Sequence, residues 1–139
     1  MKKNATRATW TAQLVAAVIL GQTLFFKFTG APEAVELFTK LGAEPFGRIG
    51  LGIVELLTVL LLLVPRTAAL GGLVTVGLMA GAVVSHLGPL GIEVAGDGGA
   101  LFGMALVTLV AGAVVTWIRP SVPSAVVQES SRPASNPVV

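Results

Sequence analysis

Residues 46–64 read FGRIGLGIVELLTVLLLLV, from Phe46 to Val64, and this run is long and apolar enough to cross a lipid bilayer. It carries Glu55 near its centre, with about 9 residues on either side, which at 1.5 Å per residue puts the carboxylate ~14 Å from each end. A charged group at that depth costs roughly 2.5–3.5 kcal/mol on insertion scales. The side chain therefore needs a partner or must be neutralised, and the run predicts a membrane protein with one buried acidic site.

The composition of the whole chain also favours a bilayer as its solvent. Hydrophobic residues make up 54% of the 139 residues and charged residues only 12%, against roughly 25% charged residues in ordinary soluble domains. A soluble single domain of this length has too high a surface-to-volume ratio to bury so much apolar surface. We therefore expect the lipid bilayer to be the main partner of the chain.

The residue inventory excludes several kinds of chemistry. Cysteine is absent, which rules out disulfide exchange, thiolate nucleophiles and cysteine-bound metal or iron–sulfur sites. One histidine and no tyrosine leave little for a metal site, so we expect no metal and no evident cofactor. The net charge of +2 is small and the basic residues do not cluster with aromatic ones, so nothing indicates binding to nucleic acid.

Other segments of the chain also have the length and apolar character of membrane spans, and they are residues 9–28, 67–87 and 99–118. With residues 46–64 they predict an all-α, polytopic membrane four-helix bundle over residues 9–119. We expect residues 1–8 to be a cytoplasmic N-terminus and residues 120–139, rich in serine and proline, to be a disordered cytoplasmic tail. A basic start before an apolar run is also typical of a cleaved signal peptide, but the near-complete spanning length and the later spans favour a first transmembrane helix.

Residues 29–45 are too short and too polar to span the membrane. Pro32 and Glu33 suit the first turn of a helix. Apolar residues then recur at i, i+3, i+4 and i+7, and they are Ala34, Leu37, Phe38 and Leu41. We predict a short amphipathic helix between the first two spans, lying on the membrane surface or packed over the end of the bundle.

Six positions of the first span follow a 4-3-4-3-4 spacing, which places them along one helical face, and five of the six are small, polar or charged: Thr9, Gln13, Ala16, Leu20, Thr23 and Lys27. In lipid such a face is expected to turn toward protein, where its hydrogen-bonding groups find partners. Ordinary helix packing is enough to explain the threonines. Lys27, at the end of the span, either extends to the interface or turns inward as a counter-charge.

Two glycine pairs and one aspartate give weaker indications of where helices pack and where the last span begins. Gly77 with Gly81 and Gly99 with Gly103 have the spacing that lets helices approach closely, although apolar glycine-rich helices contain such pairs by chance. Asp97, within a Gly-Asp-Gly-Gly sequence, is expected to cap the start of the fourth span.

Orientation follows from the basic residues. With the N-terminus inside, the cytoplasmic side holds Lys2, Lys3, Arg7, Arg66, Arg119 and Arg132, and the outer side holds Lys27, Lys40 and Arg48. This excess fits the positive-inside rule. We therefore expect a multi-pass protein of the plasma membrane with both termini in the cytoplasm.

The candidate site consists of Lys27, Arg48, Glu55 and His86. This topology places Lys27, Arg48 and His86 at the outer end of the bundle, the side toward which Glu55 has to reach. Arg48, Gly52 and Glu55 are four and three residues apart and share a helical face, with Gly52 leaving a gap between the charges. The carboxylate can hold a proton, pair with a cation or bind a polar head group. The alternative is a structural ion pair that sets helix register, and His86 taken alone is better explained as an interfacial residue.

Several motifs resemble the DoxX-like family of small bacterial membrane proteins, and the likeness covers roughly residues 10–118. The motifs are FFKFTG (25–30), LGAEPFG (41–47), GLGIVELLTVLLLLVPR (50–66) and AVVSHLG (82–88). The resemblance implies a four-helix membrane bundle and maps the family's recurrent polar positions onto Lys27, Glu55 and His86. These are positions that the charges and spacings also select.

The resemblance implies a redox context. Some members are described as subunits of thiosulfate:quinone oxidoreductase, and others as membrane partners in oxidative-stress complexes. The lack of cysteine argues against carrying sulfur on a protein thiol. A quinone-facing role stays compatible, since a quinone needs an apolar slot and one or two hydrogen-bonding or proton-donating groups. The expected function is a membrane subunit or accessory factor of a redox system, with a partner subunit or a homo-oligomer.

Two other functions compete with this one. A non-catalytic scaffold or lipid-binding protein is compatible with the same sequence. A small proton-coupled transporter also has four short helices and an embedded glutamate, but small multidrug resistance transporters carry that residue in the first helix rather than the second. A change of activity without a change of assembly on mutation of Glu55 separates the redox subunit from the scaffold.

Overall fold

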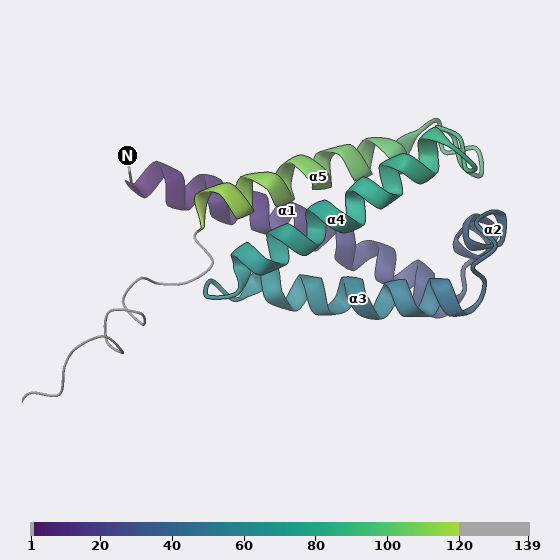
Figure 1. Cartoon of the computed structure of the whole chain (residues 1–139), viewed down its shortest axis with the longest axis horizontal. Helices are drawn as coiled ribbons and strands as arrows, with labels where there is room; N and C mark the ends of the chain where they lie inside the picture. The colour runs from purple at the N-terminus through teal and green to yellow at the C-terminus, as the bar shows by residue number, and fades with distance from the viewer. Residues whose placement is uncertain (1, 120–139) are drawn as a thin grey trace, which may run out of the picture.

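The computed structural model describes residues 2–119, so the tail expected at residues 120–139 lies outside the described part. That part is all-helical, with the elements α1 (Lys2–Thr29), α2 (Pro32–Lys40), α3 (Phe46–Leu63), α4 (Ala68–Leu87) and α5 (Ala100–Ile118) (Figure 1). Four of these helices, α1, α3, α4 and α5, are long and apolar enough to cross a membrane. The predicted all-α membrane bundle with a short helix between its first two spans is confirmed.

Helix α1 extends toward the N-terminus beyond its apolar part. The expected span begins at residue 9, whereas the helix begins at Lys2. Residues 2–8 contain lysine, arginine and alanine, which are good helix formers, and neither glycine nor proline. The change in hydropathy near residue 9 therefore marks where the apolar surface starts, not where the helix starts.

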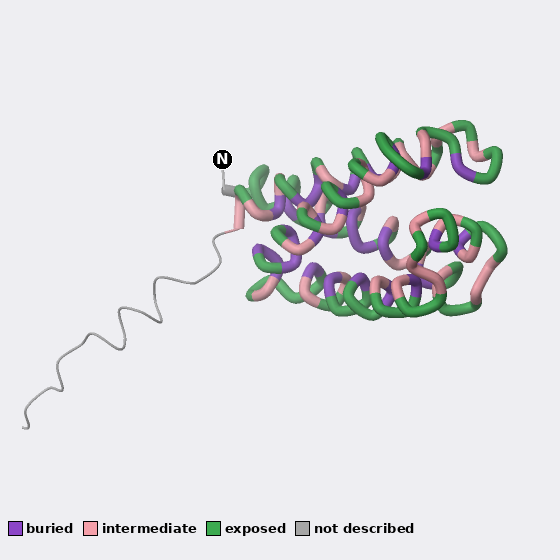
Figure 2. The backbone as a smooth tube through the Cα atoms, turned by 45° about the vertical axis from the view of Figure 1, so that its right-hand side comes forward, coloured by how far each residue is buried: buried purple, intermediate pink, exposed green. Residues whose placement is uncertain are grey.

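The four long helices form a ring in the order α1, α3, α4, α5. Helix α1 packs against α3 and α5, and α4 packs against the same two, while α3 and α5 share no contact within residues 2–119. Buried positions line the inward faces (Figure 2). The hydrophobic core consists of Ala16, Leu20, Leu62, Ala68, Met79, Ala105, Ala111 and Val115.

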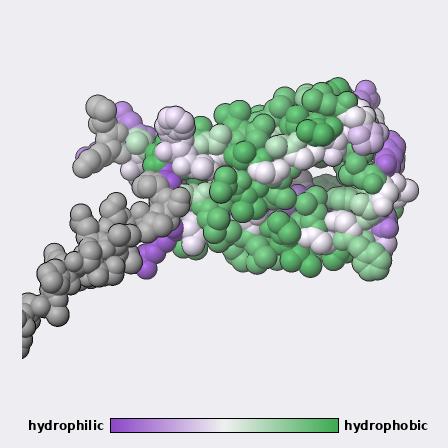
Figure 3. Space-filling model, in the orientation of Figure 1, coloured by the Kyte–Doolittle hydropathy of each residue, from purple (hydrophilic) through white to green (hydrophobic). Residues whose placement is uncertain are grey.

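The outer surface of the ring is apolar. Large side chains such as Val18, Leu57, Leu73 and Val110 are exposed, and hydrophobic residues cover the sides of the bundle, while hydrophilic ones gather at its ends (Figure 3). An exposed apolar surface of this extent is unfavourable in water, whereas lipid tails can cover it without cost. The chain is a multi-pass membrane protein in contact with the bilayer.

Close helix contacts depend on glycines other than those with the expected spacing. A Cβ on Gly71 would lie 2.8 Å from the backbone nitrogen of Leu62, and a Cβ on Gly72 would lie 2.8 Å from the carbonyl oxygen of Gly112. Gly77, Gly81 and Gly103, by contrast, have open space where a Cβ would stand. The i,i+4 spacing of glycines therefore identified helices that contain small residues, but it did not identify the face of each helix that packs against its neighbour.

Helix α2 lies against one half of the ring. Its Ala34 and Phe38 are buried, while Glu36 and Lys40 form a surface ion pair at 2.8 Å. It contacts α1 and α3 but not α4 or α5 in the described chain. It therefore sits at the ends of α1 and α3 and does not bridge to the other pair of helices (Figure 1).

The loop before α5 is organised by Asp97. Its Oδ1 accepts the backbone N–H groups of Val94 and Gly99 at 3.0 and 2.8 Å, and its Oδ2 accepts that of Leu101 at 2.8 Å. These hydrogen bonds, the one from Leu101 foremost, hold the pKa of the carboxyl below its ordinary value. The N-cap position itself is Gly99, so Asp97 stabilises the helix start from two residues before the N-cap rather than from it.

Replacing Asp97 with alanine is expected to lower the free energy of unfolding by about 1–2 kcal/mol at neutral pH, because three backbone donors lose a charged acceptor in a partly exposed loop. The pKa is lower in the folded state, so this contribution is present above the ordinary aspartate pKa and is lost as pH falls through the lowered value. Melting curves of wild type and Asp97→Ala at neutral and acidic pH check this. Exposed Glu93 in the same loop provides the control, Glu93→Ala, and an undiminished difference at acidic pH would contradict the prediction.

Candidate functional site

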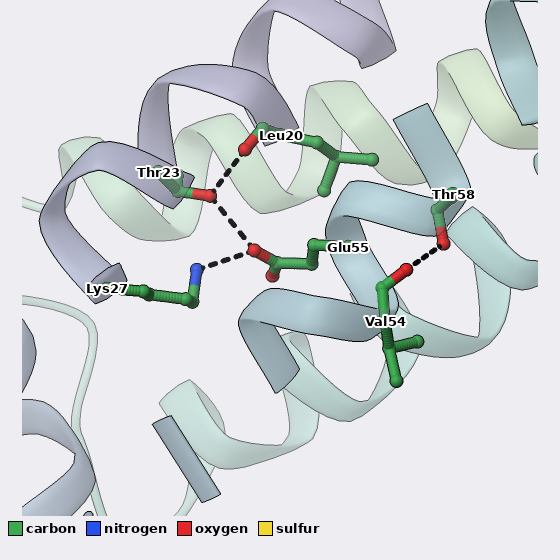
Figure 4. Close-up of polar contacts among 6 residues, drawn as sticks. All are labelled: Leu20, Thr23, Lys27, Val54, Glu55 and Thr58. Carbon is green, nitrogen blue, oxygen red and sulfur yellow. Dashed lines mark hydrogen bonds and ion pairs between the residues drawn. The ribbon is translucent and has the colours of Figure 1, made fainter. Parts of the chain in front are cut away.

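An ion pair inside the bundle joins the first two spans. Lys27 Nζ donates to Glu55 Oε2 at 2.8 Å, and the side chains are only 12% and 4% exposed (Figure 4). The hydroxyl of Thr23 lies 3.1 Å from the same oxygen. Hydrogen bonds to a charged group are stronger than those between neutral groups. The buried carboxylate accepts both of these bonds at Oε2. Glu55 Oε1 receives neither bond in the close-up (Figure 4).

Thr23 has one proton and two acceptors within reach. Its Oγ1 lies 2.8 Å from the carbonyl oxygen of Leu20 and 3.1 Å from Glu55 Oε2. A hydroxyl donates one hydrogen bond at a time. The threonine therefore either binds the carboxylate or turns back to its own helix, and its contribution to Glu55 is adjustable.

Helical periodicity places Lys27 and Glu55 on the faces of α1 and α3 that meet. Thr23 and Lys27 are one turn apart on α1, so they approach α3 together. The buried face of α3 runs through Arg48, Gly52, Glu55, Thr58 and Leu62. It is polar or small except at its last position. In a membrane helix such a face turns inward because lipid offers its groups no partners.

Gly52 allows the two helices to meet at the pair. A Cβ at this position would lie 3.1 Å from the Phe28 ring and 3.7 Å from the Lys27 Cβ. The gap expected between the two charges of α3 is thus occupied by side chains of α1. Gly52 brings the stem of Lys27 close to the helix that carries Glu55.

Arg48 does not bind Glu55. Its Nε donates to both oxygens of Glu44 at 2.9 Å, and its Nη1 donates to the carbonyl oxygen of Lys27. Arg48 and Glu55 share a face but are seven residues apart, about 10 Å along the axis, whereas Glu44 is one turn away. Arg48 is therefore a structural link between the C-terminal end of α1 and the start of α3.

His86 lies in the other half of the bundle, near the C-terminal end of α4. Its ring is 4% exposed, contacts Phe102 with 5.7 Å between centroids, and places Nδ1 2.9 Å from the carbonyl oxygen of Gly91. A carbonyl accepts only, so in the neutral ring Nδ1 carries the proton and Nε2 is the acceptor. No hydrogen bond of the described residues joins His86 to Lys27 or Glu55. The structure thus joins Lys27 and Glu55 as an ion pair, links Arg48 to the backbone of Lys27 but not to Glu55, and places His86 apart from all three.

Sequence reasoning did not assign the partners of two polar residues, of which Thr23 belongs to the site and Gln13 lies elsewhere in the bundle. Thr23 binds Glu55 but was interpreted as ordinary packing. Gln13 is fully buried, donates through Nε2 to the carbonyl oxygen of Leu62, and leaves Oε1 without a partner among the described residues. Both residues belong to the predicted inward face of the first span, so the 4-3 spacing was the signal. The spacing carries no information about which helix lies opposite.

The two halves of the bundle separate toward the end that bears α2. The surface is hollowed there between the α1–α3 pair and the α4–α5 pair (Figure 3). The described residues contain no group of three or more His, Cys, Asp or Glu side chains suited to a metal ion. What the site offers chemically is hydrogen-bond donors and a carboxylate in apolar surroundings.

A family comparison agrees with the motifs. The model of the DoxX-like family matches residues 11–94, which include most of α1, all of α2, α3 and α4, and all four candidate residues. No curated protein and no solved structure matches the chain. Because the family model covers more than half of the chain, over the helices that carry the ion pair, this protein belongs to the DoxX-like family.

Proposed function

We propose that this protein is a membrane subunit or accessory factor of a redox system, quinone-linked or connected with oxidative stress, and that its polar site is the Lys27–Glu55 pair. The observation that carries the proposal is the pair itself. Two opposite charges lie inside an apolar bundle at 2.8 Å, nearly closed off from solvent. Such pairs are costly to bury and in membranes mark functional sites more often than packing sites.

A subunit role fits the chemistry available to the chain. The sequence has no cysteine and a single histidine, so it offers no thiol couple and few ligands for a redox metal. Electrons therefore have to come from a partner protein. The proposed role of this chain is to bind the membrane-soluble electron acceptor and to transfer protons to or from it.

The residues present fit a quinone. Its apolar body suits the hollow between the helix pairs, and its carbonyl oxygens need donors. Lys27 has three N–H donors, of which one binds Glu55 Oε2. Thr23 supplies an adjustable hydroxyl, and none of the residues drawn in Figure 4 binds Glu55 Oε1, which is the oxygen we assign to the proton or donor. A bound quinone supplies an acceptor of electrons and protons, while the chain orients it and moves protons at Glu55.

The location in the plasma membrane with both termini in the cytoplasm is part of this proposal. It rests on the excess of basic residues at the end that holds the start of α1, the α3–α4 turn and the end of α5. The Lys27–Glu55 pair then lies toward the outer leaflet.

Mass spectrometry of protein extracted gently from the membrane tests the site. Wild type is expected to carry a co-purified quinone, and Glu55→Gln is expected to retain about tenfold less, equivalent to ~1.4 kcal/mol of binding free energy. Glu93→Gln removes an exposed carboxylate from the outer loop and is the matched control, with wild-type retention expected. Absence of quinone from wild type, or equal retention in Glu55→Gln, would overturn the proposal.

A second variant covers the case in which Glu55→Gln fails to fold. Thr23→Val removes the hydroxyl but leaves the ion pair and the side-chain volume. Reduced quinone retention in a Thr23→Val protein that melts like wild type supports the site. Unchanged retention in that variant counts against it.

A further inference from the structure

An arginine at the opposite end of the bundle lacks a strong partner. Arg119, at the end of α5, places Nη1 3.5 Å from the carbonyl oxygen of Pro65, the far limit of a hydrogen bond. Its guanidinium stands over the Trp10 ring with 5.4 Å to the centroid. Its Nε is buried and has no hydrogen-bond partner within residues 2–119. A buried guanidinium donor without an acceptor is costly, so an acceptor from outside the described chain is expected.

A pocket lies beside this guanidinium. It has a volume of about 340 Å³ and is lined by Ala5, Thr6, Thr9, Ile118 and Arg119. Helix α1 and the end of α5 supply its walls, and the guanidinium of Arg119 is its charged group, while the hydroxyl of Thr9 already donates to the carbonyl oxygen of Ala5. The lining suits an anionic oxygen-rich group such as a phosphate.

An apolar groove adjoins the pocket. Ala113, Val114, Trp117 and Ile118 line a space of about 280 Å³ along the outer side of α5. Ile118 lines both, so the polar pocket and the apolar groove adjoin at this residue. Trp117 is 91% exposed, and tryptophan is enriched at the level of lipid head groups. A polar cavity joined to an apolar groove at this level matches a molecule with a charged head and a hydrocarbon chain.

The charge at this end favours an anion. Lys3 and Arg7 on the start of α1 and Arg66 in the α3–α4 turn are exposed, and these segments lie at this end of the bundle (Figure 1). Each ion pair of the described residues lies at the other end or inside the bundle. The acidic side chains of residues 2–119 all fall between Glu33 and Asp97, away from the start of α1 and the end of α5. Anionic lipids are attracted to basic clusters of this kind.

We propose that this end of the protein binds one anionic phospholipid, with its phosphodiester on Arg119 and an acyl chain along the groove of α5. The site is separate from the Lys27–Glu55 pair and holds whether or not that pair binds a quinone. Free inorganic phosphate shares the head-group chemistry but has no hydrocarbon chain that could occupy the apolar groove. Binding therefore depends on both halves of the ligand.

Native mass spectrometry and melting of the purified full chain test this inference. Delipidated protein is titrated with phosphatidylglycerol, with phosphatidylcholine and with inorganic phosphate. One phosphatidylglycerol is expected to bind and to raise the melting temperature, with about tenfold weaker binding in Arg119→Gln, equivalent to ~1.4 kcal/mol. Arg66→Gln removes the same charge from an exposed position at the same end and is expected to weaken binding much less than Arg119→Gln, because it removes only a general electrostatic attraction.

Further variants separate the two halves of the site. Arg119→Lys keeps the charge but not the planar fork and is expected to fall between wild type and Arg119→Gln. Ala113→Phe fills the groove without touching a charge and is expected to weaken lipid binding as well. Equal weakening by Arg66→Gln and Arg119→Gln would indicate a diffuse charge effect and overturn the proposal. Binding of inorganic phosphate as tight as that of the lipid would also overturn it.

Discussion

Replacing Lys27 with methionine is expected to destabilise the folded protein by about 3 kcal/mol, because it leaves the carboxylate of Glu55 buried without a cation. Glu55→Gln is expected to cost less. The amide still accepts from Thr23 and Lys27, and Lys27, at the end of α1 with 12% of its side chain exposed, can extend toward the interface. The two members of the pair are therefore not equivalent, although they share one contact.

The double replacement Lys27→Met with Glu55→Met is expected to lie within about 1 kcal/mol of wild type, since it removes both buried charges at similar volume. Unfolding of wild type, Lys27→Met, Glu55→Met and the double variant in the same detergent measures the coupling as a double-mutant cycle. The surface pair Glu36–Lys40 provides the control, and Lys40→Met is expected to cost under about 0.5 kcal/mol. Additive effects of the two single replacements would show that the pair is not energetically coupled.

Gly72→Leu is expected to destabilise the bundle by about 3 kcal/mol. A Cβ at Gly72 would stand 2.6 Å from Thr116 Oγ1 and 2.8 Å from the carbonyl oxygen of Gly112, so α4 and α5 would have to separate. These two helices form the most extensive contact in the described chain. Small residues are what lets membrane helices approach this closely.

Gly77→Leu provides the control on the same helix. Its Cβ meets nothing, and the position faces lipid, so the free energy of unfolding is expected to change by less than about 0.5 kcal/mol. Denaturant unfolding of both variants in one detergent makes the comparison. A loss at Gly77 equal to that at Gly72 would contradict the assignment of the packed face and would indicate that Gly77 packs against a second copy.

Part of the candidate site was predictable from the sequence: the positions of its residues were, but their partners were not. Glu55 is conspicuous because a carboxylate in the middle of an apolar run is costly in lipid. Lys27 was open between the interface and an inward position, and the structure turns it inward onto Glu55. The 4-3 spacing placed Thr23 and Gln13 on the inward face but did not indicate their partners. Those partners, Glu55 and Leu62, lie 32 and 49 residues away in the sequence.

Arg48 and His86 were grouped with Glu55 because all were expected toward one end of the bundle. The structure pairs Arg48 with Glu44, one helical turn away, and places His86 beside Phe102 in the other half. Depth in the membrane follows from counting residues along a helix. The rotation of each helix about its axis and the neighbour it faces do not, because they depend on packing against other helices.

The sequence by itself determined the number of spans, the short helix between the first two, and the inward face of α1. Hydropathy and helical periodicity act locally, and lipid forces each span to satisfy its own backbone. Only the tertiary structure decided which groups meet: Lys27 with Glu55, Arg48 with the carbonyl oxygen of Lys27, and Gly72 with Gly112. Such contacts join helices distant in the chain, and their geometry comes from close packing of the whole bundle, which no local pattern records.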